Sequence, residues 1–242
     1  MVELDYKIEP AEQLGEAMID AMYSLYLRYY DGTSKDLFRS DLADKNYVVV
    51  LRDPQGDMQG FSTASVTGHL LDGAPVQSIY SGDTIVDHRF WGQQALPAAF
   101  LRLAGHCRAI SPDLPLYWYF LVTSERSYRF LRVYFEKFFP AHDREFPARD
   151  KALLDLFTRE RFGDLYDSGR GVVSFTASQG YLRTGWVEIP EKVRDKPDVR
   201  FFADRNPGYI RGDGLAVMTE LTWDNLKQFA RPPFRLGMES GI

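Results

Sequence analysis

The spacing of apolar residues along the chain predicts helices and strands in alternation. Over residues 12–30 the apolar positions recur every three or four residues, which is the stripe of an amphipathic helix. Gly32 is expected to end that helix, because glycine tolerates the left-handed backbone found at helix ends. A second, shorter helix is predicted to begin at Thr33 or Ser34, whose hydroxyls can accept from first-turn amides, and to reach about Ala43.

Three strands are predicted next. Residues 47–51 form a β-branched run that ends in an Asp-Pro-Gln-Gly turn, and residues 59–66 would pair with it as a hairpin. After a second turn region at 68–75, a long strand is expected at 76–86. Gly82 lies inside this strand, where a glycine often marks a bulge or the close approach of a ligand.

The segment 76–140 is predicted to form a strand–turn–helix–strand–helix unit. After residue 86 the apolar period becomes helical, and Pro97 suits the first turn of a helix, where its missing N–H has no partner to lose. The apolar, aromatic run at 116–122 is typical of a strand inside a sheet. Ser124 is suited to cap the helix that follows, which is expected to stop near the end of the segment.

The last hundred residues have a less regular pattern. The expected elements are a helix at 149–162, strands at 171–176 and 181–189, a loop at 190–213, a strand at 215–221 and a short helix at 223–229. The chain has no internal repeat and no linker long enough to force a second domain. We therefore divide it into a core at residues 1–145 and a C-terminal extension at 146–242, which would complete the sheet or cover the site.

Composition narrows the function classes. Of 242 residues 45% are hydrophobic and 26% charged, as in ordinary globular proteins, and the net charge is −5 without a basic run. Nucleic acid is therefore not an expected partner. A single cysteine, Cys107, and four scattered histidines provide neither a disulfide nor a zinc spacing, so no metal is expected. The N-terminus lacks the pattern of a signal peptide and no run is long enough for a membrane span, which predicts a cytoplasmic protein.

The predicted order of elements locates a ligand site. In a unit where a strand is followed by a helix and then by a second, parallel strand, ligands bind outside the carboxyl ends of the two strands. Here those ends lead into two loops, 86–96 and 122–127. The first loop enters a helix N-terminus, where free N–H groups and the helix dipole favour a phosphate or a carboxylate.

Two stretches of sequence carry a family resemblance. Residues 84–96 read Thr-Ile-Val-Asp-His-Arg-Phe-Trp-Gly-Gln-Gln-Ala-Leu, and residues 127–134 read Ser-Tyr-Arg-Phe-Leu-Arg-Val-Tyr. With the order of elements over 11–140, they resemble the GCN5-related N-acetyltransferase (GNAT) superfamily. In that family a bulged strand ending in valine is followed by an R/Q-x-x-G-x-G/A turn, whose amides hold the pyrophosphate of acyl-CoA. The resemblance implies an α/β fold with a GNAT-like mixed sheet flanked by helices, followed by a C-terminal α/β extension.

The turn departs from the family pattern. Without gaps, Trp91 stands where the family has arginine or glutamine, and Gln94 and Leu96 stand at the small positions. A shifted register, Arg89-x-x-Gly92-x-Gln94, restores the first two positions only. A leucine Cβ occupies space that a phosphate-binding backbone needs. The bulky Trp91 is easier to reconcile with a long-chain or carrier-bound acyl donor.

The resemblance also implies roles for particular residues. Asp83 would be the base or the partner of a substrate ammonium, and Tyr134 the acid that protonates the leaving thiolate. Read from the residues alone, Asp83 is better suited to a structural hydrogen bond and Tyr134 to the core. The implied cofactor-binding residues are Val86, Trp91, Gly92, Gln93, Gln94, Ala95 and Ser124.

The function predicted from the sequence is acyl transfer from an acyl thioester, either acyl-CoA or acyl carrier protein, to an amine of a small molecule. The alternative is a non-catalytic GNAT-fold protein that binds a small molecule or a protein partner, and the altered turn favours it. Different chemistry on an acyl thioester, such as decarboxylation, is a third reading. The sequence leaves a homodimer open.

Overall fold

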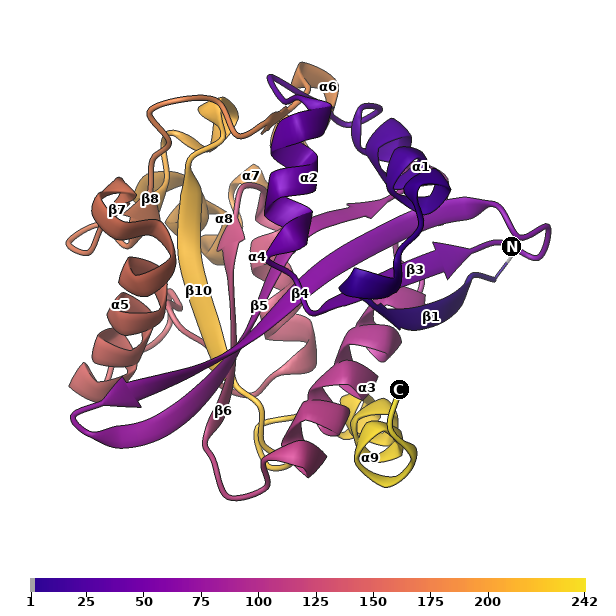
Figure 1. The fold of residues 1–242 in the computed structure, drawn as a ribbon. Coiled ribbons are helices and arrows are strands. Elements are labelled where there is room, and N and C mark those ends of the chain that lie inside the picture. Colours follow the sequence, from indigo (N-terminus) through magenta and orange to yellow (C-terminus); the bar gives the residue numbers. More distant parts are fainter. Residues whose placement is uncertain (1–2) are drawn as a thin grey trace.

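The computed structural model describes residues 3–242. Within this part of the chain an eight-stranded sheet runs in the order β1–β3–β4–β5–β6–β10–β8–β7 (Figure 1). Its strands are β1 (Asp5–Pro10), β3 (Tyr47–Arg52), β4 (Met58–Leu71), β5 (Ala74–Val86), β6 (Leu116–Val122), β7 (Tyr166–Asp167), β8 (Val172–Val173) and β10 (Gly214–Glu220). The β5–β6 pair is parallel and the other pairs are antiparallel, so the sheet is mixed.

Helices cover both faces of the sheet. They are α1 (Glu16–Tyr26), α2 (Lys35–Ala43), α3 (Ala95–Ile110), α4 (Glu125–Tyr134), α5 (Ala148–Phe162), α6 (Thr184–Val187), α7 (Glu191–Arg194), α8 (Pro197–Arg205) and α9 (Arg231–Ser240). Buried side chains of α3, α4, α8 and α9 form one core, and those of α1, α2 and α5 pack on the opposite face (Figure 1). The predicted α/β fold, a mixed sheet flanked by helices, is confirmed.

Strand β6 shows why its sequence is apolar throughout. Trp118 and Phe120 pack in the core formed with α3 and α4, whereas Tyr117 and Tyr119 pack beneath α5. A strand covered on both faces has no polar side to alternate with. The residue bounds predicted for this strand are confirmed.

The bulge expected near Gly82 is present one residue later. Phe61 of β4 pairs with Ile85 and Thr63 pairs with Gly82, so the single residue between the two β4 positions opposes two residues of β5, Asp83 and Thr84. The φ angle of Asp83 is 32°, in the region that few residues other than glycine adopt. The bulge bends β5 and re-aims its side chains.

Strands β5 and β6 separate just before the bulge. Their parallel pairing extends from Gln77–Leu116 to Ser81–Phe120 and then stops. Beyond that point β5 continues along β4, while β6 continues along β10, and Figure 1 shows the two strands diverging. The carboxyl ends of the two strands therefore border an opening in the middle of the sheet.

Several element bounds differ from the sequence prediction. The first helix ends at Tyr26 rather than Tyr30, because β2 (Tyr30–Asp31) pairs with β9 (Tyr181–Leu182). The turn at 68–75 is reduced to two residues by the extension of β4 and β5. Helix α4 stops at Tyr134; beyond it Phe135 forms an isolated bridge with Leu226, and Phe139 forms one with Met218 of β10.

The C-terminal third departs most from expectation. Within the strand predicted at 181–189 only two residues pair, and α6 follows them. The loop predicted at 190–213 contains α7 and α8, and the helix predicted at 223–229 is replaced by α9, which begins at Arg231. The two prolines at the start of α9 fit a helical first turn, where a missing N–H has no intrahelical acceptor to lose. The division at residue 145 stays a prediction; β10 pairs with β6 in the same sheet.

Candidate active site

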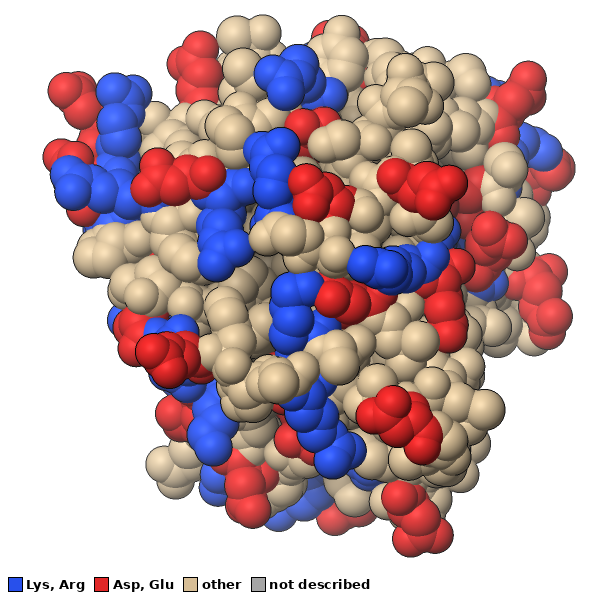
Figure 2. All heavy atoms as spheres, turned by 90° about the vertical axis from the view of Figure 1, so that its left-hand side faces the viewer, with Lys and Arg blue, Asp and Glu red and all other residues tan. Residues whose placement is uncertain are grey.

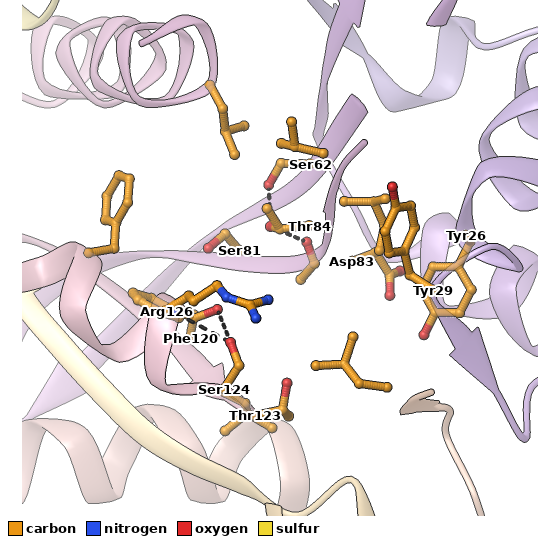
Figure 3. Close-up of a pocket in the computed structure, with 18 of the residues that line it drawn as sticks. Tyr26, Tyr29, Ser62, Ser81, Asp83, Thr84, Phe120, Thr123, Ser124 and Arg126 are labelled. Carbon is orange, nitrogen blue, oxygen red and sulfur yellow. Dashed lines mark hydrogen bonds between the residues drawn. The ribbon is translucent and has the colours of Figure 1, made fainter. Parts of the chain in front are cut away.

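A cavity of about 1190 Å³ opens where β5 and β6 separate. Its walls come from both faces of the sheet: from α3 and α4 on one side, from α1, α2 and α5 on the other, and from parts of residues 162–186. Figure 3 shows its centre, with side chains from the two strand ends facing one another. Every residue predicted for the site lines this cavity, namely Asp83, Tyr134, Val86, Trp91, Gly92, Gln93, Gln94, Ala95 and Ser124.

The N-terminus of α3 borders the cavity. Gln94 is the N-cap residue, and the first backbone bond of the helix runs from the Ala98 amide to the Gln94 carbonyl, over 2.9 Å. The amides of Gln94, Ala95 and Leu96 precede that bond and have no intrahelical acceptor, while Pro97 has no N–H. These amides and the positive end of the helix dipole can hold an anion.

The Trp91 side chain packs against the carboxyl end of β5. Its indole Nε1 donates to the carbonyl of Val86 over 2.8 Å. The guanidinium of Arg126 lies 4.2 Å from the centre of its ring, and Trp186 of α6 packs edge-on at 5.3 Å. Gly92 follows with a φ of 89°, which requires glycine at this turn. Trp91 thus joins the turn, α4 and the C-terminal extension at the cavity wall.

Two glutamines of the turn are held by hydrogen bonds. The Gln93 side-chain oxygen accepts from the backbone amide of Leu4 over 2.9 Å, which ties the turn to the segment before β1. The Gln94 side-chain oxygen accepts from the hydroxyl of Tyr134 over 2.8 Å. Burial raises the pKa of Tyr134.

The N-terminus of α4 faces the same cavity. Ser124 caps this helix, since its hydroxyl accepts from the amide of Ser127, so the capping interpretation of Ser124 is confirmed. Arg126 and Arg129 follow in the first two turns and line the cavity. In Figure 3 the Arg126 guanidinium extends into the space between Thr84 and Ser124. Nothing in the sequence singled out these two arginines.

Asp83 is placed by the bulge on the face of α1 and α2. Its Oδ2 atom is enclosed and has no hydrogen-bond partner within residues 3–242. Burial, followed by the charge of Asp41 and a hydrogen bond between the two carboxyl groups, raises the pKa of Asp83 to about 8. Burial and the nearby Asp83 also raise the pKa of Tyr26, whose ring lies beside Asp83 in Figure 3.

Asp41 of α2 completes a cluster that was not expected from the sequence. Its side chain forms an ion pair with the buried Lys45, whose Nζ also donates to the Asp41 carbonyl over 2.8 Å. Arg161 of α5 lies 3.6 Å away. Burial works against the ionised form, but Lys45 and the bond with Asp83 hold the pKa of Asp41 below its ordinary value. One carboxyl group of the pair is therefore ionised while the other keeps its proton near neutral pH.

Other chemistry finds less support in the described residues. Between residues 3 and 242, no three His, Cys, Asp or Glu side chains gather in a way that could hold a metal ion. Cys107 is buried in α3, and burial raises the pKa of its thiol to about 12.

No helix in residues 3–242 has the length and apolar character to cross a bilayer. Figure 2 shows positive and negative side chains interspersed over the face around α5.

Comparison with known proteins gives likeness in fold over part of the chain. No family model matches the sequence, and no curated protein matches it. A protein of unknown function from Enterococcus faecalis, described as a probable N-acyltransferase, is 13% identical, with a TM-score of 0.40 over 55% of this chain and 33% of its own. A GNAT family N-acetyltransferase from Escherichia coli, solved with CoA, is 16% identical, with a TM-score of 0.39 over 56% and 70%. Glucosamine-6-phosphate N-acetyltransferase from Arabidopsis thaliana is 16% identical, with a TM-score of 0.31 over 46% and 80%.

The match spans only a third of the Enterococcus protein, the first of these relatives. The likeness covers about half of this chain, whose own sheet is mixed, flanked by helices and open between two parallel strands.

Proposed function

We propose that the protein transfers an acyl group from acyl-CoA to an amine of a small molecule. The observation that carries the proposal is the cavity through the sheet at the point where β5 and β6 separate. It has helix N-termini and arginines on one side and the Asp83–Asp41 pair on the other. A thioester and an amine entering from opposite faces would meet between the two strand ends.

The side of α3 and α4 suits the donor. The free amides at residues 94–96 and the charges of Arg126 and Arg129 offer binding for phosphates. Apolar rings of Phe100, Trp118 and Phe130 line the same side and would contact the acyl or pantetheine part. Because Trp91 occupies the end of β5, the arginines of α4 would take a share of the phosphate binding that a small-residue turn otherwise provides.

The side of α1 and α2 suits the acceptor. An ammonium must lose a proton before its nitrogen attacks the thioester carbonyl, and the ionised Asp83 carboxylate would take that proton. Attack by the neutral amine gives a tetrahedral adduct that still carries one proton too many on its nitrogen. As the adduct collapses to the amide and the CoA thiolate, the Tyr134 hydroxyl gives its proton to the thiolate, and the surplus proton of the nitrogen passes through solvent to the tyrosinate that is left. A carboxyl with a pKa of about 8 is a stronger base than an ordinary aspartate and is partly ionised at neutral pH.

Release of free thiol tests the proposal. The protein would be incubated with acetyl-, hexanoyl- and dodecanoyl-CoA, each with and without a mixture of primary amines, and the thiol measured with a chromogenic disulfide. We expect amine-dependent release with at least one ester, together with the corresponding amide by mass spectrometry. No amide with any ester, despite a thermal shift by acyl-CoA, would overturn acyl transfer.

A second function is favoured by two specific contacts. The Val86 carbonyl is already bonded to Trp91, and the Tyr134 hydroxyl is already bonded to Gln94. A protein whose donor-facing groups bond to one another could bind a ligand in this cavity without reacting. A bound acyl-CoA at 100 times its dissociation constant would add about 2.7 kcal/mol of stability. Stabilisation without amide formation would identify this non-catalytic function.

The donor could also be presented by a carrier protein. The same pantetheine thioester would then enter from α4, and the carrier would supply its own surface contacts. Amide formation from acyl carrier protein but not from the matching acyl-CoA would identify that donor. A cytoplasmic location and a homodimer remain predictions from the sequence.

A further inference from the structure

The cavity also specifies the chemical character of the acceptor. We propose that the acceptor is a primary amine carried on an apolar body, with its ammonium between Asp83 and Asp41 and its body against the rings of α1, α2 and α5. The inference rests on the proposed function for the direction of acyl transfer. The binding of the amine stands on the geometry of the cavity alone.

The cations nearest to Asp83 form their ion pairs with Asp41, so an ionised Asp83 could pair with a further cation. In the described part of the chain Lys45 and Arg161 both form ion pairs with Asp41, and no cation forms one with Asp83. Glu160 is bonded to the ring of His69, whose other nitrogen is bonded to Ser78. An ionised Asp83 would therefore lack a partner, and a buried carboxylate needs one. A proton fills this role in the free protein, and a substrate ammonium can replace it.

The enclosed Asp83 oxygen lies at the same site. Oδ2 has no hydrogen-bond partner among residues 3–242, although it belongs to a side chain that lines the cavity. Unpaired buried polar atoms are rare in native structures, and a bound ion or ligand is one explanation for such an atom. An ammonium has three donors and can bond both carboxyl groups at once.

Apolar side chains surround this polar end. Those on the same side of the sheet are Tyr26, Phe38, Tyr80, Phe162, Leu165 and Phe175. Phe162, Leu165 and Phe175 come from the C-terminal extension, which thus forms part of the acceptor wall. Binding against these side chains is favourable because it removes apolar ligand surface from water. Phe38, Phe162, Leu165 and Phe175 offer no hydrogen-bond partner to the hydroxyls of a sugar or nucleotide.

The lining argues against two other classes of amine. A polyamine needs carboxylates spaced along its length, whereas the acids here are gathered at one end with two cations among them. An amino sugar needs several donors and acceptors around its ring, whereas Phe38, Phe162, Leu165 and Phe175 offer none. An arylalkyl or alkyl amine satisfies both the charged end and the wall.

Calorimetric binding without any acyl donor tests the inference. The probes are phenethylamine and hexylamine, with phenethyl alcohol, glucosamine and spermidine as comparisons. We expect both apolar amines to bind at least about tenfold more tightly than each comparison compound, which is a difference of about 1.4 kcal/mol. Equal or tighter binding of glucosamine or spermidine would overturn the apolar-body part of the inference.

Proton release provides a second measurement. The groups that face Asp83 are Asp41 and Lys45 from α2 and its end, Tyr26 from α1, Tyr30 from β2, Tyr80 from β5, and Arg161 and Glu160 from α5. Asp83 keeps its proton at pH 7 in the free protein and would lose it beside an ammonium. Titrations in two buffers of different ionisation enthalpy should therefore report release of nearly one proton per bound amine. Binding without proton release would contradict the placement at Asp83.

Two variants complete the design. Asp83→Asn removes the second carboxylate and should weaken binding of hexylamine at least tenfold and abolish proton release. Asp36→Asn makes the same chemical change on an exposed position of α2 and should alter neither. Circular dichroism would verify that both variants fold. Unchanged affinity in the Asp83 variant would overturn the site.

Different results would contradict the amine site and the proposed acyl transfer. Amine binding with proton release but no amide from any thioester would leave the amine site intact and remove acyl transfer. Amide formation on glucosamine or spermidine, with weak binding of the apolar amines, would retain acyl transfer and remove the apolar acceptor.

Discussion

The hydroxyl of Tyr134 donates to the side-chain oxygen of Gln94 over 2.8 Å and joins the end of α4 to the beginning of α3. Tyr134 is the proposed acid, and Gln94 occupies the N-cap position of the helix whose first amides would bind the donor. The bond couples these two parts of the site, because a donor that needs the hydroxyl must first draw it away from Gln94.

Replacing either partner of this bond separates its two roles. Tyr134→Phe should lower kcat about 100-fold, the usual size of a general-acid contribution, with little change in KM. Gln94→Ala removes the competing acceptor and should keep kcat within a few-fold of the wild type. Thiol-release kinetics measure both. Equal losses in the two variants would show that the bond matters only for structure.

Asp83 should control the pH dependence of the reaction. Its pKa of about 8 means that the ionised base accumulates as the pH rises through that value. We expect kcat/KM to rise with pH and to level off above about pH 8. Asp83→Asn should lower kcat about 100-fold and remove this rise. A pH profile that is the same in variant and wild type would exclude Asp83 as the base.

The same shift predicts a pH dependence of stability. The folded-state pKa of Asp83 is raised from 3.8 to about 8, so the folded protein binds its proton more tightly than the unfolded chain. The stabilising effect of that proton is complete below pH 3.8 and is lost as the pH rises toward 8. Asp83→Asn should therefore gain melting temperature relative to the wild type as the pH rises from 4 to 8. A constant difference in Tm would contradict the shift.

Trp91 should limit access of the donor to the end of β5. In Trp91→Phe the ring under Arg126 is retained and the hydrogen bond to the Val86 carbonyl is lost. The freed carbonyl could accept from the donor, and one such bond corresponds to a decrease in KM for acyl-CoA of about threefold to tenfold. A higher KM would show that the indole itself binds the donor.

The contact between α3 and α9 should not tolerate a side chain. A Cβ atom at Gly105 would lie 1.9 Å from the Phe234 carbonyl, and one at Gly237 would lie 1.9 Å from that of Arg102. Gly105→Ala should therefore cost about 1–3 kcal/mol in the free energy of unfolding. Gly68→Ala, in β4, meets no atom within 4 Å and serves as the control in denaturant titrations.

Local signals in the sequence were sufficient for the core of the fold. The change of period after residue 86, Pro97 in a first turn and Ser124 as a cap located α3, β6 and α4, because each depends on the residues next to it. The same signals failed in the last third. There, β9 exists only because β2 lies beside it, and α8 and α9 depend on packing against distant elements.

The sequence by itself determined the turn between β5 and α3 and the presence of a bulge near Gly82. Only the tertiary structure decided what faces that bulge. Asp41, Arg126 and Arg161 are ordinary charged residues of helices, and no local pattern indicates which face of a helix meets a strand far away in the chain. Their meeting with Asp83 and Trp91 is set by how the helices pack across the opened sheet. Burial, which raises the pKa of Asp83, is likewise a property of the packed molecule.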